Sequence, residues 1–268
     1  MKCLGIIAGG GNSPVIAAKN ARDAGWRVVV FVIEETGAEF PESSADKVRV
    51  ISLAKAGEAI DFFQSEGVTD VLIIGKVDKT INFMGHDFDE AALSMLARLA
   101  GRGDIQIAQV VIEELEDLGY RVRKQTEFLG DRLLPERVLC GALDERAEKD
   151  VAKGLAVARS LSAHDIGQTV VVRESAVIAV EAFEHTDATI ERAGSLVDGG
   201  FVVVKVARPN QDLRFDVPAV GPDTIKAISK AGGKVLAAQA GCTFMFEKEN
   251  MLKLAEEFGI AVVGVKFS

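Results

Sequence analysis

Short apolar runs alternate with helical patterns through the first half of the chain, and this alternation limits the folds that the chain can adopt. Strands are predicted over residues 3–8, 26–33, 48–52 and 70–75, with helices over residues 14–24 and 56–67 between them. A strand, a helix and a second strand in this order form a unit in which the two strands are parallel. Helices over residues 89–99 and 105–118 and a strand over 120–123 follow. The first half therefore predicts a parallel sheet with flanking helices.

The second half of the sequence has a different rhythm. Residues 169–173 and 176–182 flank Glu174 and Ser175, a pattern typical of an antiparallel hairpin. The other predicted elements are helices over residues 144–162, 187–193, 223–231 and 250–258, and strands over 201–206, 234–238, 243–246 and 261–265. We therefore expect an α/β protein with a parallel-sheet domain over residues 1–130, a linker over 131–143 and a distinct C-terminal mixed α/β domain over 144–268.

Composition excludes several classes of function. The chain has 268 residues, of which 48% are hydrophobic, and a formal net charge of −9, which argues against general nucleic-acid binding because that requires a cationic surface. No apolar run approaches the ~20 residues of a membrane span, and no signal peptide is evident, so we expect a cytoplasmic protein. Cys3, Cys140 and Cys242 lack metal-ligand spacing, which predicts reduced core residues.

A glycine-rich turn follows the first predicted strand. Gly9, Gly10, Gly11 and Asn12 precede Ser13 and Pro14, where a helix is predicted to begin. Backbone N–H groups at such a turn bind anions, so the turn predicts a phosphate site. A tight connection without a ligand is the alternative. Proline replaces the third glycine of the dinucleotide fingerprint, which disfavours nicotinamide chemistry, although Glu34 and Glu35 end the next strand where a ribose-binding acid would stand.

Charged residues crowd the segment after the apolar run 201–204. Asp212 and Asp216 can supply hard oxygen ligands for Mg²⁺, and Lys205, Arg208 and Arg214 can neutralise phosphate oxygens. Ordinary surface ion pairs on an irregular loop are the alternative. His86, His164 and His185 are the only histidines, too few for an imidazole-rich two-metal centre.

A second polar group surrounds the predicted hairpin. Gln168 lies in the segment that precedes the hairpin, and Glu181, Thr186 and Asp187 lie in the segment that closes it before a helix, so both segments stand at strand ends. A carboxylate at Glu181 would share a strand face with apolar residues and therefore needs a partner. Thr186 can also be interpreted as the N-cap of the following helix, with Asp187 in its first turn.

Four segments together resemble the LpxI family, the magnesium-dependent UDP-2,3-diacylglucosamine pyrophosphatases of bacterial lipid A synthesis. They are residues 4–11, 165–168, 180–187 and 208–221. His185 stands where the family pattern has glycine, and Arg208 stands where lysine is common. The resemblance implies a Rossmann-like N-terminal domain, a distinct C-terminal domain and a lipid-bearing nucleotide sugar as substrate. It allows for peripheral contact with the inner face of the inner membrane and for a homo-oligomer.

The implied reaction is Mg²⁺-assisted hydrolysis of UDP-2,3-diacylglucosamine to UMP and 2,3-diacylglucosamine 1-phosphate. In this hypothesis Asp216 binds Mg²⁺ or orients the attacking water, and Asp212 supports it. Arg214 and Lys205 stabilise the developing phosphate charge. Gln168, Glu181, Thr186 and Asp187, with the glycine turn, bind the substrate. The competing hypotheses are a nucleotide-sugar binding module without catalysis and a nucleotide-sugar oxidoreductase.

Overall fold

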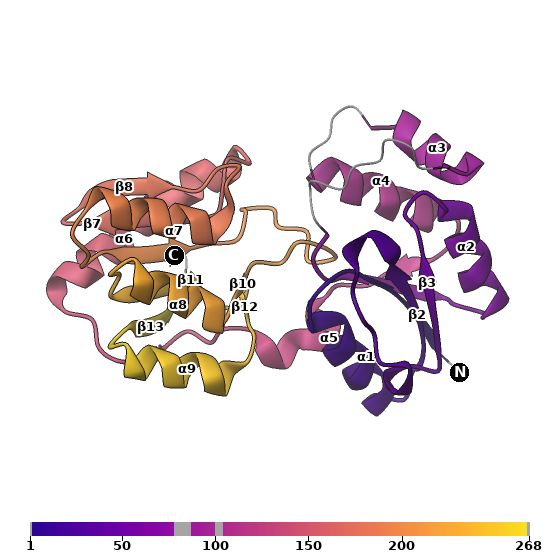
Figure 1. Ribbon diagram of the computed structural model, residues 1–268, viewed down its shortest axis with the longest axis horizontal. Helices are drawn as coiled ribbons and strands as arrows, with labels where there is room; N and C mark the ends of the chain where they lie inside the picture. The colour runs from indigo at the N-terminus through magenta and orange to yellow at the C-terminus, as the bar shows by residue number, and fades with distance from the viewer. Residues whose placement is uncertain (1, 78–86, 100–103, 267–268) are drawn as a thin grey trace. The chain divides into compact units, whose positions relative to one another are not determined.

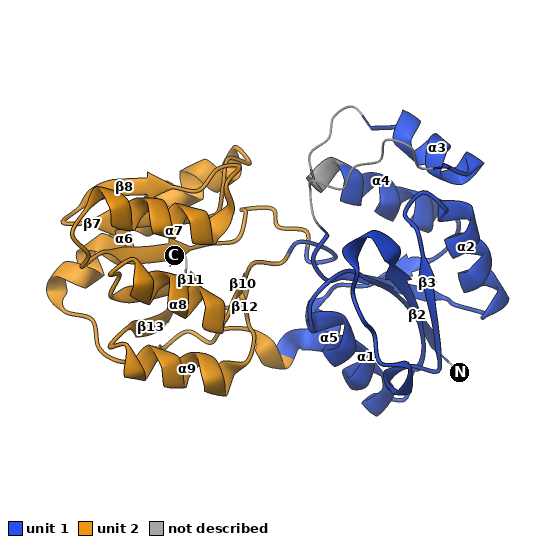
Figure 2. Cartoon of the chain, in the orientation of Figure 1, with its two compact units in different colours: residues 1–130, 213–216 blue, residues 131–212, 217–268 orange. Residues whose placement is uncertain are grey.

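The computed structural model describes residues 2–77, 87–99 and 104–266, without the side chains of residues 104–106 (Figure 1). These residues form two compact units, each with its own main sheet (Figure 2). The first unit comprises residues 1–130 and 213–216, and the second comprises residues 131–212 and 217–268.

The first unit is built on a five-stranded, fully parallel sheet with the strand order β3-β2-β1-β4-β5. The strands are β1 (Cys3–Ala8), β2 (Arg27–Ile33), β3 (Lys47–Ile51), β4 (Asp70–Ile74) and β5 (Arg121–Val122). The predicted parallel sheet is therefore confirmed. The strand order reverses between β1 and β4, and open sheets of this kind bind ligands beyond the carboxyl ends of the strands at that switch point.

Helices cover both faces of this sheet, which is why six of the seven residues of β2 are buried. On one face, Phe62 and Phe63 pack with Phe31 of β2 and Leu115. On the other face, the helix after β1 buries three alanines and contacts β1 and β2. The helices are α1 (Ser13–Asp23), α2 (Ala56–Ser65), α3 (Glu90–Ala97), α4 (Asp104–Asp117) and α5 (Thr126–Leu129), with short 3₁₀ turns η1 (Glu34–Thr36), η2 (Glu42–Ser44) and η3 (Gly130–Arg132).

A buried carboxylate holds the short strand β5 to β4. Asp70, fully buried at the start of β4, accepts hydrogen bonds from Arg121 at 2.8 Å and from Thr69 Oγ1 at 2.7 Å, and Arg123 lies 3.4 Å away. Burial alone would raise the pKa of Asp70, but the hydrogen bonds from Arg121 and Thr69 outweigh it and lower that pKa. Asp70 therefore stays ionised and stabilises the amino edge of the sheet.

The second unit contains a six-stranded mixed sheet with the order β6-β13-β11-β9-β7-β8. β9, β11 and β13 are parallel, whereas β6, β7 and β8 each pair antiparallel with a neighbour. The strands are β6 (Val138–Cys140), β7 (Thr169–Arg173), β8 (Ala176–Val180), β9 (Val202–Lys205), β11 (Val235–Gln239) and β13 (Ala261–Val265). β10 (Ala219–Val220) and β12 (Phe244–Met245) form a separate parallel pair. The predicted distinct mixed α/β domain is confirmed.

Strand alternation divides the core of the second unit between the two faces of the sheet. Val202 and Val204 of β9 pack with Val151 and Ala158 of α6 (Glu145–Ala163), whereas Val203 belongs to the cluster on the other face. That second cluster takes residues from α7 (His185–Leu196), α8 (Pro222–Lys230) and α9 (Lys248–Glu257). The fully buried run 201–204 thus supports a layer of helices on each side.

The hairpin predicted around Glu174 and Ser175 is present. Arg173 pairs with Ala176, and Glu174 and Ser175 have φ values of 53° and 62°. The carboxylate of Asp150, buried on α6, accepts hydrogen bonds from both turn amides, at 2.9 Å from Glu174 and 2.6 Å from Ser175. Helix α6 thereby holds this turn closed.

Two segments differ from the expected division of the chain. Residues 131–143, predicted to be a linker, contain β6, which pairs with β13 and extends the sheet of the second unit. Residues 213–216, predicted to lie in the C-terminal domain, are grouped with the first unit. Both differences depend on pairing with residues distant in sequence, which local patterns do not report.

Two further sequence expectations concern cysteines and membrane spans. All three cysteines are free; Cys3 and Cys140 are buried and Cys242 is half-buried. Among the residues that the structure describes, no helix combines the length and the apolar character that crossing a membrane requires.

Candidate active site

The glycine turn lies at the carboxyl end of β1, against the end of β4. Gly9 N–H donates to Ile74 O at 2.8 Å, and Gly10 and Lys76 exchange hydrogen bonds of 2.7 and 2.8 Å. A Cβ at Gly9 would lie 2.6 Å from Lys76 O, and one at Gly75, whose φ is +109°, would lie 2.6 Å from the Gly9 carbonyl carbon. Glycine is therefore required here so that two backbone segments can touch.

The predicted phosphate-binding amides are not equivalent. Those of Gly9 and Gly10 are already bonded to the end of β4. In the part of the chain that the structure describes, the amides of Gly11 and Asn12 have no hydrogen-bond partner, and both residues are exposed. Asn12 occupies the N-cap position of α1, and Pro14 stands in the first turn, as predicted. An anion bound here would thus meet the amides of Gly11 and Asn12 at the positive end of a helix dipole.

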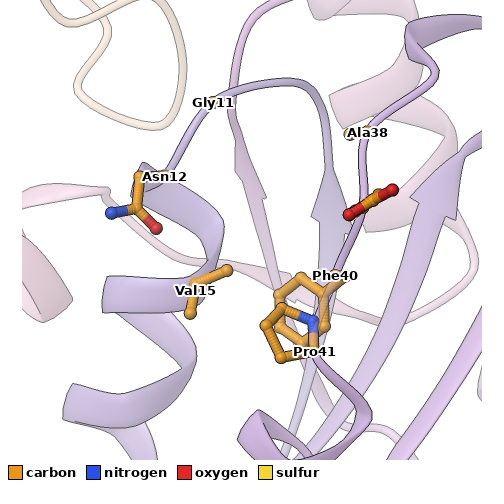
Figure 3. Close-up of a pocket in the computed structure, with 7 residues that line it drawn as sticks. Gly11, Asn12, Val15, Ala38, Phe40 and Pro41 are labelled. Atoms are coloured by element: carbon orange, nitrogen blue, oxygen red, sulfur yellow. The ribbon is translucent and has the colours of Figure 1, made fainter.

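A pocket of about 480 Å³ opens beside this turn. Val15 points toward Phe40 and Pro41 across it (Figure 3). The lining residues are Gly11, Asn12, Val15, Ala38, Glu39, Phe40 and Pro41, from the start of α1 and the segment after β2. The volume lies within the range of ordinary small-molecule sites, and the proline and phenylalanine offer flat apolar surface. The pocket is adjacent to the exposed residues Gly11 and Asn12 at the start of α1.

The acidic residues after β2 have separate surroundings. Both carboxylate oxygens of Glu35 accept the amide of Leu53, each at 3.0 Å, and Ser52 Oγ also donates to Glu35. Glu35 therefore holds the segment between β3 and α2. Glu34 is exposed in η1. Both acids stand where a ribose-binding group was expected. Glu35 holds the backbone of the neighbouring segment, whereas Glu34 is exposed.

A polar cluster lies at the carboxyl end of β9 in the second unit, where the start of β7 and the start of α7 meet it. Lys205 Nζ donates to Thr186 Oγ1 at 2.7 Å, and Thr186 Oγ1 donates to Glu181 Oε1 at 3.1 Å. The hydroxyl of the buried Thr169 lies 3.3 Å from that of Thr186. Glu181 Oε2 accepts the amide of Gln168 at 3.3 Å. The sequence placed these groups at strand ends, and the structure brings them into one network.

Helix α7 begins one residue before Thr186. The N-cap position belongs to Glu184, whose side chain makes no capping bond, and the first helical residue is His185. The interpretation of Thr186 as the N-cap is therefore wrong, because its hydroxyl is bonded to Lys205 and Glu181 instead. Asp187 lies exposed in the first turn, as predicted. His185 has a φ of +68°, which explains why glycine suits this position in the family pattern.

The loop after β9 first follows the second unit. Val206 N–H donates to Gln168 O at 2.9 Å, and Ala207 N–H donates to Gln239 Oε1 at 2.9 Å. Gln168 Nε2 donates to Gln211 Oε1 at 3.1 Å. Arg208 forms an ion pair with Asp165 at 2.8 Å. Sequence reasoning missed Gln239 and Thr169; the signal was a polar residue at the end or start of an apolar strand, where parallel strands often place ligand groups.

The loop then enters the first unit before it returns. Leu213 O accepts the amide of Gln125 at 2.7 Å, and Arg214 forms a 2.8 Å ion pair with Glu116. Asp212 is thus assigned to the second unit and Asp216 to the first. Asp216 is exposed and has a φ of +49°. Non-glycine residues in such a conformation are uncommon and concentrate at functional sites.

The resemblance to the family implies Mg²⁺, so the structure should contain side chains that can bind this ion. Within the described part of the chain, no group of three or more His, Cys, Asp or Glu side chains is arranged to hold a metal ion. Mg²⁺ keeps several waters and uses one or two carboxylates, so Asp212 and Asp216 fit it in number and in chemistry. His164 and His185 are both exposed, whereas His86 lies outside the described residues.

Comparisons with known proteins cover the whole chain. A model of the LpxI N-terminal domain matches residues 3–132, and a model of the LpxI C-terminal domain matches residues 135–263. The UDP-2,3-diacylglucosamine pyrophosphatase LpxI of Caulobacter vibrioides is 31% identical over 281 residues, which cover 99% of this chain and 98% of that protein.

Similar solved structures are more distant. The precorrin-6A reductase CobK is 14% identical, with a TM-score of 0.35, over 100% of this chain and 89% of that one. The N5-carboxyaminoimidazole ribonucleotide synthetase from Thermotoga maritima is 18% identical, with a TM-score of 0.25, over 69% of this chain and 42% of that one. Neither TM-score is high enough to support an inference. The two domain models and the full-length relative agree, however, and on their evidence the chain belongs to the LpxI family.

Proposed function

We propose that this protein hydrolyses the pyrophosphate bond of UDP-2,3-diacylglucosamine and releases UMP and 2,3-diacylglucosamine 1-phosphate, in a Mg²⁺-dependent step of lipid A biosynthesis. The observation that carries the proposal is the match of 99% of the chain to a protein named as a pyrophosphatase of this substrate. The two candidate binding edges support it, because one offers groups for a nucleotide and the other offers a cation for phosphate.

The first unit would bind the nucleotide. The amides of Gly11 and Asn12 face solvent at the start of α1, where a phosphate oxygen accepts hydrogen bonds from backbone N–H groups. The pocket beside them would hold the uridine, with its base against Phe40. Gly9 and Gly10 would contribute by shaping the turn, since their own amides are bonded to β4.

The second unit would supply charge for the phosphate. Lys205, at the carboxyl end of β9, carries an ammonium group that donates a hydrogen bond to Thr186 Oγ1. Gln168, Glu181 and Asp187 lie at the same strand ends or in the first turn of α7. Arg214, which is grouped with the first unit, is the second cation that we assign to the phosphate, in addition to its ion pair with Glu116. Preorganised cations of this kind stabilise charge that develops in the transition state.

Asp216 would orient the attacking water, and with Asp212 it would hold the metal ion. When bound, Mg²⁺ would neutralise phosphate oxygens and make a water molecule a better nucleophile. The left-handed backbone of Asp216 supports this assignment, because such a conformation is uncommon for residues other than glycine and concentrates at functional sites.

The test is a direct assay of UMP release. The protein is incubated with UDP-2,3-diacylglucosamine and Mg²⁺, with a chelator, and with a chelator followed by excess Mg²⁺. We expect UMP only when Mg²⁺ is present, and no hydrolysis of UDP-N-acetylglucosamine without acyl chains. Binding of the lipid nucleotide without UMP release would contradict the proposal and favour a binding module. UMP release that persists after exhaustive chelation would contradict the role of the metal.

The diacyl substrate also implies a location for the protein. Two fatty chains partition into a bilayer, so we propose peripheral contact with the cytoplasmic face of the membrane that holds the substrate. Flotation with vesicles, with and without the lipid nucleotide, measures this contact. A homo-oligomer is a further part of the proposal, and light scattering of the purified protein measures its mass.

A further inference from the structure

The ammonium group of Lys205 and the carboxylate of Glu181 belong to one network but do not touch. Lys205 Nζ donates to Thr186 Oγ1 at 2.7 Å, and Thr186 Oγ1 donates to Glu181 Oε1 at 3.1 Å. Glu181 forms no direct ion pair with any residue that the structure describes. The hydroxyl of Thr186 therefore stands between a positive and a negative group, and its dipole is aligned with both.

The hydroxyl of Thr186 is fully used by its neighbours. A threonine hydroxyl has one proton to donate and two lone pairs to accept with. Its proton is directed to Glu181, one lone pair accepts from Lys205, and Thr169 Oγ1 lies 3.3 Å away as the third neighbour. An ionised phosphate oxygen can only accept hydrogen bonds. It would therefore compete with Glu181 for the single proton that the Thr186 hydroxyl can donate. Thr186 is thus poorly suited to bind phosphate itself.

The backbone around this hydroxyl is rigid. Thr169 pairs with Lys205 across β7 and β9, and Glu181 N–H donates to Thr169 O at 2.8 Å. A Cβ at Gly167 would lie 2.0 Å from Glu181 O, so the segments before β7 and after β8 are in direct contact. Lysine itself has a flexible four-carbon stem and no preferred direction for its charge. The hydrogen bond to Thr186 gives the ammonium group a defined direction.

We propose that Thr186 is a positioning residue that orients the Lys205 ammonium group through its hydrogen bond to Glu181. This inference rests on the proposed hydrolysis, in which Lys205 stabilises developing phosphate charge. Its consequence is that Thr186 and Glu181 act on the rate of the chemical step through Lys205, and contribute little to substrate affinity. A misplaced cation at a transition state commonly costs on the order of a hundredfold in rate.

The experiment is a double-mutant cycle with Thr186→Val and Lys205→Met, and with Thr186→Ser as the matched control. Valine has the shape of threonine without the hydroxyl, and serine keeps the hydroxyl. We expect Thr186→Val to lower kcat on the order of ten- to a hundredfold with KM within about twofold, and Thr186→Ser to recover most of the activity. In the Lys205→Met background, Thr186→Val should have no further effect. Independent, multiplicative losses, or a raised KM with unchanged kcat, would overturn the inference.

A second measurement decides the inference without activity. The side-chain ammonium resonance of Lys205, detected by ¹⁵N NMR, should be protected from exchange in the wild type and in Thr186→Ser, and should be lost in Thr186→Val. Circular dichroism shows whether each variant is folded. If the wild type releases no UMP, the proposed function fails, and the resonance alone establishes or refutes the positioning. An ammonium signal that is unchanged in Thr186→Val would refute it.

Discussion

The two candidate binding edges occupy equivalent places in their sheets but use different chemistry. In the first unit, the groups beyond β1 are backbone amides, and glycines let β1 and β4 approach. In the second unit, the groups beyond β9 are side chains in a hydrogen-bonded network. A backbone site should be sensitive to the size of a side chain and tolerant of its chemistry. A side-chain site should show the reverse, and we expect the first edge to govern binding and the second to govern rate.

The largest effect is expected where a side chain carries the chemistry, at Asp216. Asn keeps the size of Asp and also tolerates a left-handed backbone, so Asp216→Asn removes charge and little else. We expect UMP release to fall on the order of 10²–10³-fold, as for other lost electrostatic contacts in catalysis. Asp223→Asn, on the exposed start of α8, is the control and should keep full activity. More than about a tenth of wild-type turnover in Asp216→Asn would rule out this role.

A substitution at Gly75 tests whether glycine is needed for the close approach of β1 and β4 in the first unit. In Gly75→Ala, the new Cβ would meet the backbone of Gly9 at 2.6 Å in a conformation unfavourable for any side chain. We expect the free energy of unfolding of the first unit to fall by roughly 3 kcal/mol, from strain and overpacking together. Gly11→Ala is the control, because its φ is +89° but nothing lies within 4 Å of the new Cβ, and should cost about 1 kcal/mol.

Urea unfolding followed by the fluorescence of Trp26, the single tryptophan, reports on the first unit. Equal destabilisation by Gly75→Ala and Gly11→Ala would show that the close approach of β1 and β4 is not what requires glycine.

A substitution at Phe40 tests whether the first edge governs substrate binding and leaves the catalytic rate unchanged. This residue lines the pocket beside the glycine turn, and a base stacked on it would lose about 1–3 kcal/mol on truncation. We expect Phe40→Ala to raise KM and the inhibition constant of UMP about tenfold while kcat changes less than about twofold. Val50→Ala, an exposed position on β3, serves as the control. If Phe40→Ala lowered kcat and left KM unchanged, the assignment of binding to the first edge would be wrong.

The smallest effect concerns the backbone that supports the side-chain network. His185 has a φ of +68° at the start of α7, where glycine avoids the cost of a Cβ. We expect His185→Gly to stabilise the folded protein by roughly 1 kcal/mol, whereas His185→Ala should not. Thermal unfolding followed by circular dichroism measures the difference. A midpoint for His185→Gly below that of the wild type would show that the histidine side chain itself stabilises the turn.

Local patterns predicted the elements whose structure is set by near neighbours. The hairpin at Glu174 and Ser175 and the strand run before Lys205 follow from strand periodicity and a two-residue turn. β6 was missed because three residues show no periodicity, and only its pairing with β13 makes it a strand. Thr186 was interpreted as an N-cap because its residue type suits one. The helix begins one residue earlier, at His185, whose left-handed conformation no local propensity favours.

The sequence by itself determined the order of most strands and helices, the glycine turn and the polar residues at strand ends, because each depends on neighbours along the chain. Only the tertiary structure decided which of those polar groups meet. Residues 168, 181, 186 and 205 come together through the pairing of β7 with β9 and the contact of Gly167 with Glu181. A shift of one residue in that pairing would turn Lys205 to the other face of the sheet, and strand register is set by burial across the whole core.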